Sequence, residues 1–378
     1  MDYSKKSIEE HKKYRGKLSV EGVLPIENRD DLSIAYTPGV AAVCTEIADG
    51  SDAREFVTSK NTVAVITDGS AVLGLGNIGA VAGLPVMEGK AALFKKFGGV
   101  NAFPIALNTQ DTEEIIQAVK YIAPTFGGIN LEDIAAPRCF DIERRLSEEL
   151  DIPVFHDDQH GAAIVALAGL FNALKVVGKE REDVKIVING CGAAGVATAK
   201  LLKSAGFLNV YIADSRGLIA NCRDDLNNTK HDLLDCCCVS DLCGALKDAL
   251  VGADVFIGVS VGNLLTSDDI KMMNKDAIVF AMANPVPEIL PDDARAGGAR
   301  VVATGRSDYG NQLNNALVFP GLFKGLFESG AQKVTIEMKL KVAETLAELI
   351  ETPTEDRIIP DVFDKRVAEA VSSAIIST

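Results

Sequence analysis

The sequence has no apolar segment at its start and no apolar run long enough to cross a bilayer. Residues 1–17 are charged throughout, which excludes the apolar stretch of a secretory signal. The long apolar segment that begins at Gly161 meets Asn172 and Lys175 too soon to span a membrane. We therefore expect a soluble, cytoplasmic protein without a membrane partner.

Positive charge is also scarce in this chain. Lys and Arg number 38 against 53 Asp and Glu, which gives a formal net charge of −15. Because nucleic-acid binding needs a basic surface, this balance argues against a nucleic-acid partner. A negative surface also repels anionic substrates at long range, so a site for such a substrate needs positive charge of its own.

Paired cysteine spacings of the CxxC kind are missing, although the chain has eight cysteines. Without a secretory signal, we expect reduced thiols and no disulfide framework. The run CCC at 236–238, with Cys243 and His231 nearby, allows a zinc site as one interpretation. Small apolar side chains on a helix are the alternative, which the lack of paired spacing favours.

The chain does contain enough apolar sequence for two or three domains. Its 378 residues are 47% hydrophobic and 24% charged, a balance that can bury a sizeable core. Apolar runs alternate with helical patterns, which predicts an α/β fold. Strands are expected at TVAVITDG, VNAFPIALN, INLEDI, DIPVF, VKIVING, NVYIAD, ADVFIGVS, AIVFAMANP and RVVATG. The last five predict a doubly wound parallel sheet of the Rossmann type.

A complete dinucleotide-binding pattern follows the strand at 184–190. The loop GCGAAG at 190–195 leads into an uninterrupted helix, and the next strand ends at Asp214. The first glycine of this pattern makes the tight turn, the second lets the backbone approach a pyrophosphate, and the third allows close helix–strand packing. A purely structural βαβ unit is the alternative. Cofactor contacts are expected from Gly190, Gly192, Ala193, Ala194 and Gly195.

Asp214 bears on the choice of nicotinamide cofactor. An acid at this place bonds the ribose hydroxyls and favours NAD over NADP. Arg216, two residues later, offers the alternative of a contact with the 2′-phosphate of NADP. NAD is therefore the expected cofactor, with NADP possible.

A second glycine-rich segment, GLGNIG at 74–79, is not predicted to be the main nucleotide site. Gly83 and Pro85 are expected to interrupt any helix after it, and the following strand carries no acid at its end. We expect a tight loop whose backbone N–H groups approach an anion.

Two acidic pairs follow predicted strands. Glu132 and Asp133 end the strand INLEDI, and Asp157 and Asp158 follow the strand DIPVF. Because the carboxyl ends of neighbouring parallel strands meet at one edge of a sheet, both pairs are expected there. Carboxylate oxygens at such an edge suit Mg²⁺ or Mn²⁺. Helix capping by these acids is the alternative.

Lys90 and Tyr36 are candidates for proton transfer. Lys90 is predicted on the first turn of a helix beside an apolar run, where desolvation would lower its pKa toward use as a base. An exposed lysine is the alternative. Tyr36 precedes Pro38, which can open a helix, so the tyrosine would lie on the loop and point into a cleft. Simple packing within the loop is the alternative.

Asparagines occur just past predicted elements of the second half. Loops at that place in an open α/β sheet face the ligand crevice, where amides can donate to a carboxylate or to a nicotinamide. Turn formation is the alternative for an Asn in a loop. The residues concerned are Asn284, Asn314 and Asn315.

The sequence as a whole resembles the malic enzymes, specifically the small bacterial type. Eight motifs in order carry the resemblance: AYTPGVA, LPVMEGK, NLEDI, FHDDQHGAAIVALAGL, GCGAAG, DSRGLI, ANPVPE and NNALVFPG. The resemblance implies a substrate and metal domain at 1–155 and a nucleotide domain at 156–320. It also implies a homodimer. The helical segment at 321–378 is expected to pack on the first domain or on the dimer partner.

The resemblance also implies roles for the candidate residues. Glu132, Asp133 and Asp158 match the metal ligands of the family. Lys90 matches its base and Tyr36 its acid. The implied substrate is L-malate, which would lose hydride from C2 to the nicotinamide while Lys90 takes the hydroxyl proton. Loss of CO₂ and protonation of C3 by Tyr36 would then give pyruvate.

The substrate contacts are partly implied by the family and partly open. Asp157 matches its supporting carboxylate, and Asn284 and Asn315 match substrate-contacting asparagines. Larger malic enzymes carry a substrate-binding arginine in a motif that is absent here. GLGNIG occupies the comparable region, so Asn77 and its neighbouring amides are expected to serve instead.

Two other functions compete with this interpretation. A metal-free amino-acid dehydrogenase also joins a catalytic domain to a Rossmann domain and uses lysine, but it would leave both acidic pairs idle. A non-catalytic nucleotide-binding regulator would leave Lys90 and Tyr36 without a role.

Overall fold

Two parallel sheets hold the strands that the sequence predicts. The computed structural model describes residues 3–72, 74–236 and 242–378. The first sheet has the order β2-β1-β3-β4. Its strands are β1 (Thr62–Thr67), β2 (Asn101–Ala106), β3 (Gly128–Leu131) and β4 (Val154–His156). All pairs are parallel, and Leu131 is in register with both Ile66 and His156. The residues that follow β1, β3 and β4 therefore lie at one edge.

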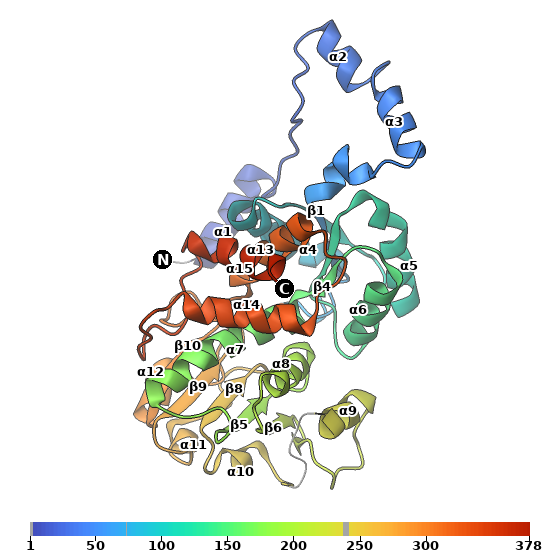
Figure 1. The fold of residues 1–378 in the computed structure, drawn as a ribbon. Helices are drawn as coiled ribbons and strands as arrows, with labels where there is room; N and C mark the ends of the chain where they lie inside the picture. Colours follow the sequence, from blue (N-terminus) through green and yellow to red (C-terminus); the bar gives the residue numbers. More distant parts are fainter. Residues whose placement is uncertain (1–2, 73, 237–241) are drawn as a thin grey trace.

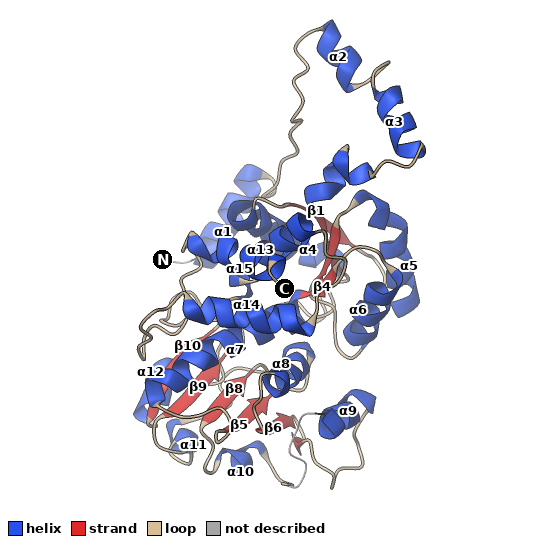
Figure 2. Cartoon of the chain, in the orientation of Figure 1, coloured by secondary structure: helices blue, strands red, loops and turns tan. Residues whose placement is uncertain are grey.

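Helices cover the first sheet on both faces (Figure 2). They are α4 (Ala80–Leu93), α5 (Thr112–Ile122) and α6 (Arg138–Glu149), whereas α1 (Tyr3–Tyr14) has no buried residue. The prediction that Gly83 and Pro85 break a helix is wrong, because both lie inside α4. Lys90 accordingly lies in the last turn of α4 and not in a first turn. Packing of this helix on β1 and β2 outweighs the backbone hydrogen bond that Pro85 removes.

The long helix α7 (Asp157–Val177) begins directly after β4 and runs through the middle of the molecule (Figure 1). By length and composition it is the one helix among the described residues that could cross a membrane, so the expectation that Asn172 and Lys175 make this segment too short is wrong. Most of its apolar side chains are buried inside the protein, against both sheets and the C-terminal helices. α7 is thus the core helix that joins the two halves.

The second sheet has the order β10-β9-β8-β5-β6-β7. Its strands are β5 (Lys185–Asn189), β6 (Asn209–Asp214), β7 (Gly217–Leu218), β8 (Val255–Gly258), β9 (Ala277–Ala281) and β10 (Ala299–Thr304). Only the short β7 is antiparallel among these pairs. The helices α8 (Ala193–Ser204), α9 (Asn228–Cys236), α10 (Leu246–Leu250), α11 (Ser267–Ile270) and α12 (Pro291–Ala296) connect them. The chain leaves β5 in one direction to β6 and later in the other to β8, which makes the switch point where such sheets bind ligands.

The C-terminal helices return to the first half of the chain. They are α13 (Phe319–Ser329), α14 (Ile336–Glu348) and α15 (Arg366–Ile376), so the predicted helical segment at 321–378 consists of three separate helices. The Phe319 and Phe94 ring centroids lie 4.6 Å apart, and α14 packs along α7. The segment packs on its own N-terminal half; the predicted boundaries at 155 and 320 stay predictions.

The expectation of reduced thiols is wrong at one place. Cys222 and Cys243 form a disulfide, while Cys44 and Cys139 are not bonded to another cysteine. Cys243 is therefore no thiolate ligand, which removes it from the zinc interpretation. Cys237 and Cys238 lie outside the described residues.

An arm of residues 18–57 stands out from the rest of the molecule, at the end of the first half that is farthest from the second sheet (Figure 1). It contains α2 (Arg29–Ala35) and α3 (Val40–Ala48), and no residue of either helix is buried. Tyr36 ends α2 and is 67% exposed.

Candidate active site

Four carboxylates gather at the carboxyl edge of the first sheet. Glu132 and Asp133 follow β3, and Asp157 and Asp158 open α7 directly after β4. The alternative that these acids cap helices is wrong, because the N-cap of α7 is His156 and that of α6 is Pro137. These carboxylates instead contact residues of other elements at the sheet edge: Asp158 accepts from the Asp133 N–H, and Glu132 pairs with Lys90.

A hydrogen bond from the backbone of Asp133 to the side chain of Asp158 joins the two acidic pairs. The Asp133 N–H donates to Asp158 Oδ2 at 2.7 Å. Asp133 has a φ of 54°, which is the left-handed region that side chains other than Gly seldom adopt. Strained backbone of this kind is typical of functional sites.

Lys90 is the cation of this cluster. Its side chain is only 7% exposed, and its Nζ lies 2.9 Å from Glu132 Oε1 and donates to Asp157 Oδ2. The Nζ also lies 4.2 Å from the centre of the Phe319 ring, a favourable cation–π position. Asn315 donates its side-chain amide to the same Asp157 oxygen. Residues from α4, β3, α7 and the C-terminal segment therefore meet at one ammonium group.

The pKa of Lys90 is shifted opposite to the predicted direction. Burial alone would lower it, but the negative charges of Asp157 and Glu132 outweigh burial and raise it. Burial in turn raises the pKa of Glu132 and of Asp157, and the neighbouring carboxylates raise both further. The cluster thus holds more negative charge than its one ammonium can balance.

This charge imbalance fits a hard divalent cation. Glu132, Asp133 and Asp158 supply the carboxylate oxygens that Mg²⁺ and Mn²⁺ prefer. Across the described ranges, their side chains are not gathered into a finished coordination sphere. The fit therefore rests on the oxygen donors and on the repulsion among the carboxylates, which a cation would relieve.

A cleft of about 870 Å³ connects this edge to the second sheet. Its walls come from both halves of the chain and include Leu75, Asp133, Asp158, Gly192, Ala193, Ala194, Asn284, Asn314 and Asn315. Gly74 closes one side: a Cβ there would lie 2.2 Å from the backbone oxygen of Asn284, and its φ is +74°. Only glycine permits this approach of the GLGNIG loop to the second half.

The GCGAAG loop has the geometry expected of a dinucleotide site. Gly192 is the N-cap of α8, and a Cβ on Gly195 would lie 1.7 Å from the backbone oxygen of Gly190. The close packing assigned to the third glycine is therefore present. The N-terminus of α8 opens into the cleft, where it can accept an anion.

Asp214 lies at the end of β6, as predicted, but basic side chains hold it. Arg223 Nη1 donates to it at 2.8 Å and Lys230 Nζ at 2.6 Å. Arg216 donates its backbone N–H to Asp214, while its guanidinium binds Asp225. Sequence reasoning missed Arg223 and Lys230, because no motif spacing links them to Asp214.

The remaining predicted residues divide into two groups. Asn284, Asn314 and Asn315 line the cleft. Asn77 does not: its side-chain amide is paired with that of Gln110 at 2.8 and 3.0 Å. Tyr36 lies on the exposed arm and not among the residues of the cleft wall.

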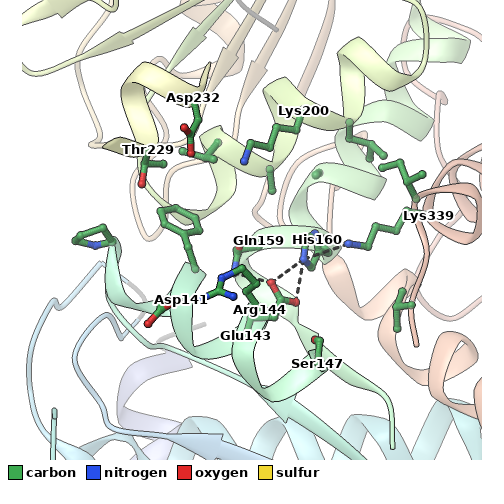
Figure 3. A pocket seen from close by; sticks show the side chains of 18 of the residues that line it. Asp141, Glu143, Arg144, Ser147, Gln159, His160, Lys200, Thr229, Asp232 and Lys339 are labelled. Atoms are coloured by element: carbon green, nitrogen blue, oxygen red, sulfur yellow. Dashed lines mark hydrogen bonds and ion pairs between the residues drawn. The ribbon is translucent and has the colours of Figure 1, made fainter. Parts of the chain in front are cut away.

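A second cavity of about 770 Å³ lies on the other side of the first turns of α7 (Figure 3). Glu143 accepts hydrogen bonds there from Gln159 at 3.0 Å and from His160 at 2.9 Å. Lys339 of α14 reaches His160, with its Nζ 3.1 Å from Nδ1. Nothing in the sequence pattern pointed to this cluster.

Comparison with known proteins agrees with this geometry. Residues 15–115 and 108–147 match the malic enzyme N-terminal domain, and residues 159–378 match the malic enzyme NAD binding domain. The chain is 54% identical to the NAD-dependent malic enzyme of Geobacillus stearothermophilus, over 96% of this chain and 76% of that protein. It is 52% identical to the bifunctional malic/malolactic enzyme of Bacillus subtilis, over 99% and 92%. The crystal structure of the NAD-dependent malic enzyme of Thermotoga maritima superposes with a TM-score of 0.95 at 48% identity, covering 98% of each chain.

Proposed function

The chain belongs to the malic enzyme family, and from that premise we propose that it converts L-malate to pyruvate and CO₂ with NAD as hydride acceptor and Mg²⁺ or Mn²⁺ as metal. Its activity as an NAD(P)-dependent malic enzyme follows from the family domains and close relatives. The metal, the preference for NAD and the residue roles are our proposals. The observation that carries them is Lys90, buried against Asp157 and Glu132 at the edge of the cleft.

Lys90 is proposed to exchange the proton of the substrate hydroxyl. It takes that proton as a neutral amine while hydride leaves C2 for the nicotinamide at the GCGAAG loop. Because Asp157 and Glu132 favour the ammonium, the neutral form requires that their charge be offset, as a cation held by Glu132 would do. Asp157 and Glu132 then stabilise the ammonium that results, because both carboxylates lie against Nζ. Asn315 donates to the same Asp157 oxygen as Lys90 and helps to hold that carboxylate in place.

Glu132, Asp133 and Asp158 are the residues that would hold the metal. A divalent cation there would supply Lewis-acid stabilisation of negative charge on the substrate oxygen and would offset the charge of these carboxylates. The cleft needs such positive charge, since malate is a dianion and the protein itself carries −15. Asn284 and Asn315 are proposed to orient the substrate carboxylate.

The test is absorbance of the reduced nicotinamide with malate, Mn²⁺ and either NAD or NADP, before and after EDTA. We expect reduction with pyruvate as the product, lost on chelation and restored by Mn²⁺. Reduction that survives EDTA would contradict the metal proposal. A metal-free amino-acid dehydrogenase and a non-catalytic regulator are not favoured, because neither agrees with the family of both domains.

We propose that NAD is preferred and NADP accepted. Asp214 favours the ribose hydroxyls, but Arg223 and Lys230 offset its charge, and Arg216 adds an exposed guanidinium close by. Asp225 pairs with both Arg216 and Arg223, so most of this positive charge is already balanced. Asp214 therefore keeps the preference for the ribose hydroxyls, while Arg216 gives a 2′-phosphate one exposed cation to contact. The ratio of kcat/KM for the two cofactors in Arg216→Ala tests this: the NADP value should fall and the NAD value should stay.

A further inference from the structure

A buried glutamate lies behind one wall of the cleft. Glu288 follows β9 in the segment before α12, and its side chain is fully buried. Its Oε1 accepts the backbone N–H of Ser260 at 2.9 Å, and its Oε2 accepts that of Ala283 at 3.0 Å. Ser260 follows β8 and Ala283 follows β9, and both residues line the cleft. One carboxylate therefore joins the ends of two neighbouring strands of the second sheet.

The backbone around Glu288 leaves room for this carboxylate. Gly258 ends β8, and a Cβ on it would lie 2.3 Å from Glu288 Cδ, so a larger residue would displace the side chain. The link also reaches β5, because Asn189 at the end of that strand donates its side-chain amide to the Ser260 hydroxyl. Hydrogen bonds thus tie together the ends of β5, β8 and β9, the three strands that meet the cleft on this side.

The charge of Glu288 is not balanced by a cation. Within the part of the chain that the structure describes, no Lys or Arg forms an ion pair with it, and its partners are backbone N–H groups. Burial raises the pKa of Glu288, whereas the N–H groups of Ser260 and Ala283 favour its charged form. Arg306 donates to the Pro285 backbone oxygen of the same loop at 3.0 Å, but Asp308 balances its charge. A net negative charge therefore lies behind the wall.

The strand order indicates which part of the cofactor this wall faces. β6 lies on one side of β5, while β8 and β9 lie on the other (Figure 1). Since the GCGAAG loop after β5 is the expected pyrophosphate site and Asp214 after β6 the expected ribose site, the nicotinamide half extends over β8 and β9. The ring of NAD is cationic and becomes neutral when it accepts hydride. A carboxylate that is shielded from water attracts the cationic form.

We propose that Glu288 positions the nicotinamide end of the cleft and makes it favour the oxidised, cationic ring over the reduced, neutral one. Glu288 is a positioning residue, because it acts through Ser260 and Ala283 and contacts no reacting group. The proposal rests on the proposed function for the place of the cofactor in the cleft. It requires two properties of this side chain: a length that lets its two oxygens reach both N–H groups, and a negative charge.

Two substitutions separate the charge from the length. Glu288→Gln removes the charge and keeps the length, although its amide nitrogen cannot accept the second N–H. Glu288→Asp keeps the charge but is one methylene too short to reach both N–H groups. Isothermal titration calorimetry gives the Kd of NAD, NADH and ADP-ribose for each protein, and kcat is measured with malate and Mn²⁺.

Glu288→Gln should change the balance between the two forms of the cofactor. We expect the ratio of the Kd of NAD to the Kd of NADH to rise about three- to tenfold. ADP-ribose lacks the ring and should bind as it does to wild type, which a general distortion of the nucleotide site would not allow. An unchanged ratio would overturn the proposal.

Glu288→Asp should keep the wild-type ratio of the two Kd values and lower kcat by about 10- to 100-fold, because the ends of β8 and β9 are no longer held together. If Glu288→Gln does not fold, this variant decides: a changed ratio or an unchanged kcat would overturn the proposal. Asp292→Asn removes an exposed carboxylate from α12 and should change neither quantity.

The two kinds of measurement also separate this inference from the function itself. If the wild-type protein makes no pyruvate from malate, the proposed function fails, and the ratio of the two Kd values still decides the role of Glu288. If the wild-type protein makes pyruvate and the ratio does not respond to Glu288→Gln, only the role of Glu288 fails.

Discussion

Two lysines, Lys90 buried and Lys339 partly buried, lie on opposite sides of the first turns of α7, and their surroundings shift their pKa values in opposite directions. Lys90 contacts Asp157 on the cleft side, and its pKa is raised by Asp157 and Glu132 despite burial. Lys339 contacts His160 on the side of the second cavity (Figure 3), and burial lowers its pKa. The carboxylates shift too: the pKa of Glu132 is raised, while that of Glu143 is lowered to about 2.

The difference comes from which sign of charge is in excess. Asp157, Glu132 and Asp158 all act on one ammonium, that of Lys90, so the ammonium is stabilised and the acids are not. Around Glu143, one carboxylate faces Lys339 and His160 and accepts three hydrogen bonds, so the acid is stabilised and the bases are not. The cluster around Lys90 has an excess of negative charge that another cation would balance. In the cluster around Glu143, the carboxylate is already balanced by His160 and Lys339. We therefore expect substitutions in the first to affect catalysis and those in the second to affect stability.

The largest expected effect is loss of turnover in Lys90→Met. If Lys90 moves the hydroxyl proton, kcat for malate oxidation should fall by about 10²–10⁴. Lys96→Met, an exposed lysine that follows the same helix, should keep the wild-type rate. Near-normal turnover of Lys90→Met, measured with saturating Mn²⁺ and NAD, would remove Lys90 from the mechanism.

Glu143→Gln should destabilise the protein without changing its chemistry. Burial alone would raise the pKa of Glu143, but His160 and Lys339 lower it from 4.5 to about 2. A difference of this size contributes roughly 3 kcal/mol to the free energy of unfolding near neutral pH. Because the folded pKa is the lower one, this contribution is complete above about 4.5 and is lost as the pH falls toward about 2.

Urea unfolding of wild type and Glu143→Gln over this range checks the pH dependence. The gap between the two proteins should be largest near neutral pH and should shrink below about 4.5. Ser147→Ala removes a hydroxyl from the wall of the same cavity. Its free energy of unfolding should equal that of wild type at every pH. A gap that is the same at every pH would mean that the charge of Glu143 is not the stabilising feature.

The strands and both glycine loops could be predicted because their signals are local. Apolar runs bounded by turns gave β1, β5 and β8, and the parallel arrangement placed the two acidic pairs at one edge. The helix through Pro85 could not be predicted, since packing on β1 and β2 decides it. The exposed arm could not be predicted either, because exposure depends on what the rest of the chain leaves uncovered.

The pKa of Lys90 shows a similar limit at the site. Burial was one of two interpretations of Lys90, an exposed lysine being the other, and burial alone implied a lowered pKa. The direction reversed because Asp157, 67 residues later, and Glu132 both reach its ammonium. Likewise, Asp214 was placed correctly, but Arg223 and Lys230 come from a loop whose path the sequence does not show. Local sequence patterns identified Lys90 and Asp214 as site residues. The charged residues that contact them could be identified only from the folded structure.

Metal binding should stabilise only the protein with the first cluster intact. At Mn²⁺ about one hundred times above its Kd, the folded state should gain about 2.7 kcal/mol. Thermal unfolding with and without Mn²⁺ should show the gain in wild type and in Glu143→Gln, and lose it in Asp158→Asn. A wild-type Tm that Mn²⁺ does not change, or an unchanged shift in Asp158→Asn, would contradict the proposed ligand set.

The smallest expected effect is that of Lys339→Met. Since burial lowers the pKa of Lys339, the folded protein disfavours its ammonium, and an apolar side chain of similar length removes that cost. The loss of the attraction to Glu143 opposes this gain, so the free energy of unfolding should change by less than about 1 kcal/mol. The sign should favour wild type as the pH rises, because the ammonium that the fold disfavours is then neutralised. A large loss of stability at neutral pH would mean that Lys339, and not the hydrogen bonds from α7, keeps Glu143 ionised, and the two clusters would then differ less than their charges suggest.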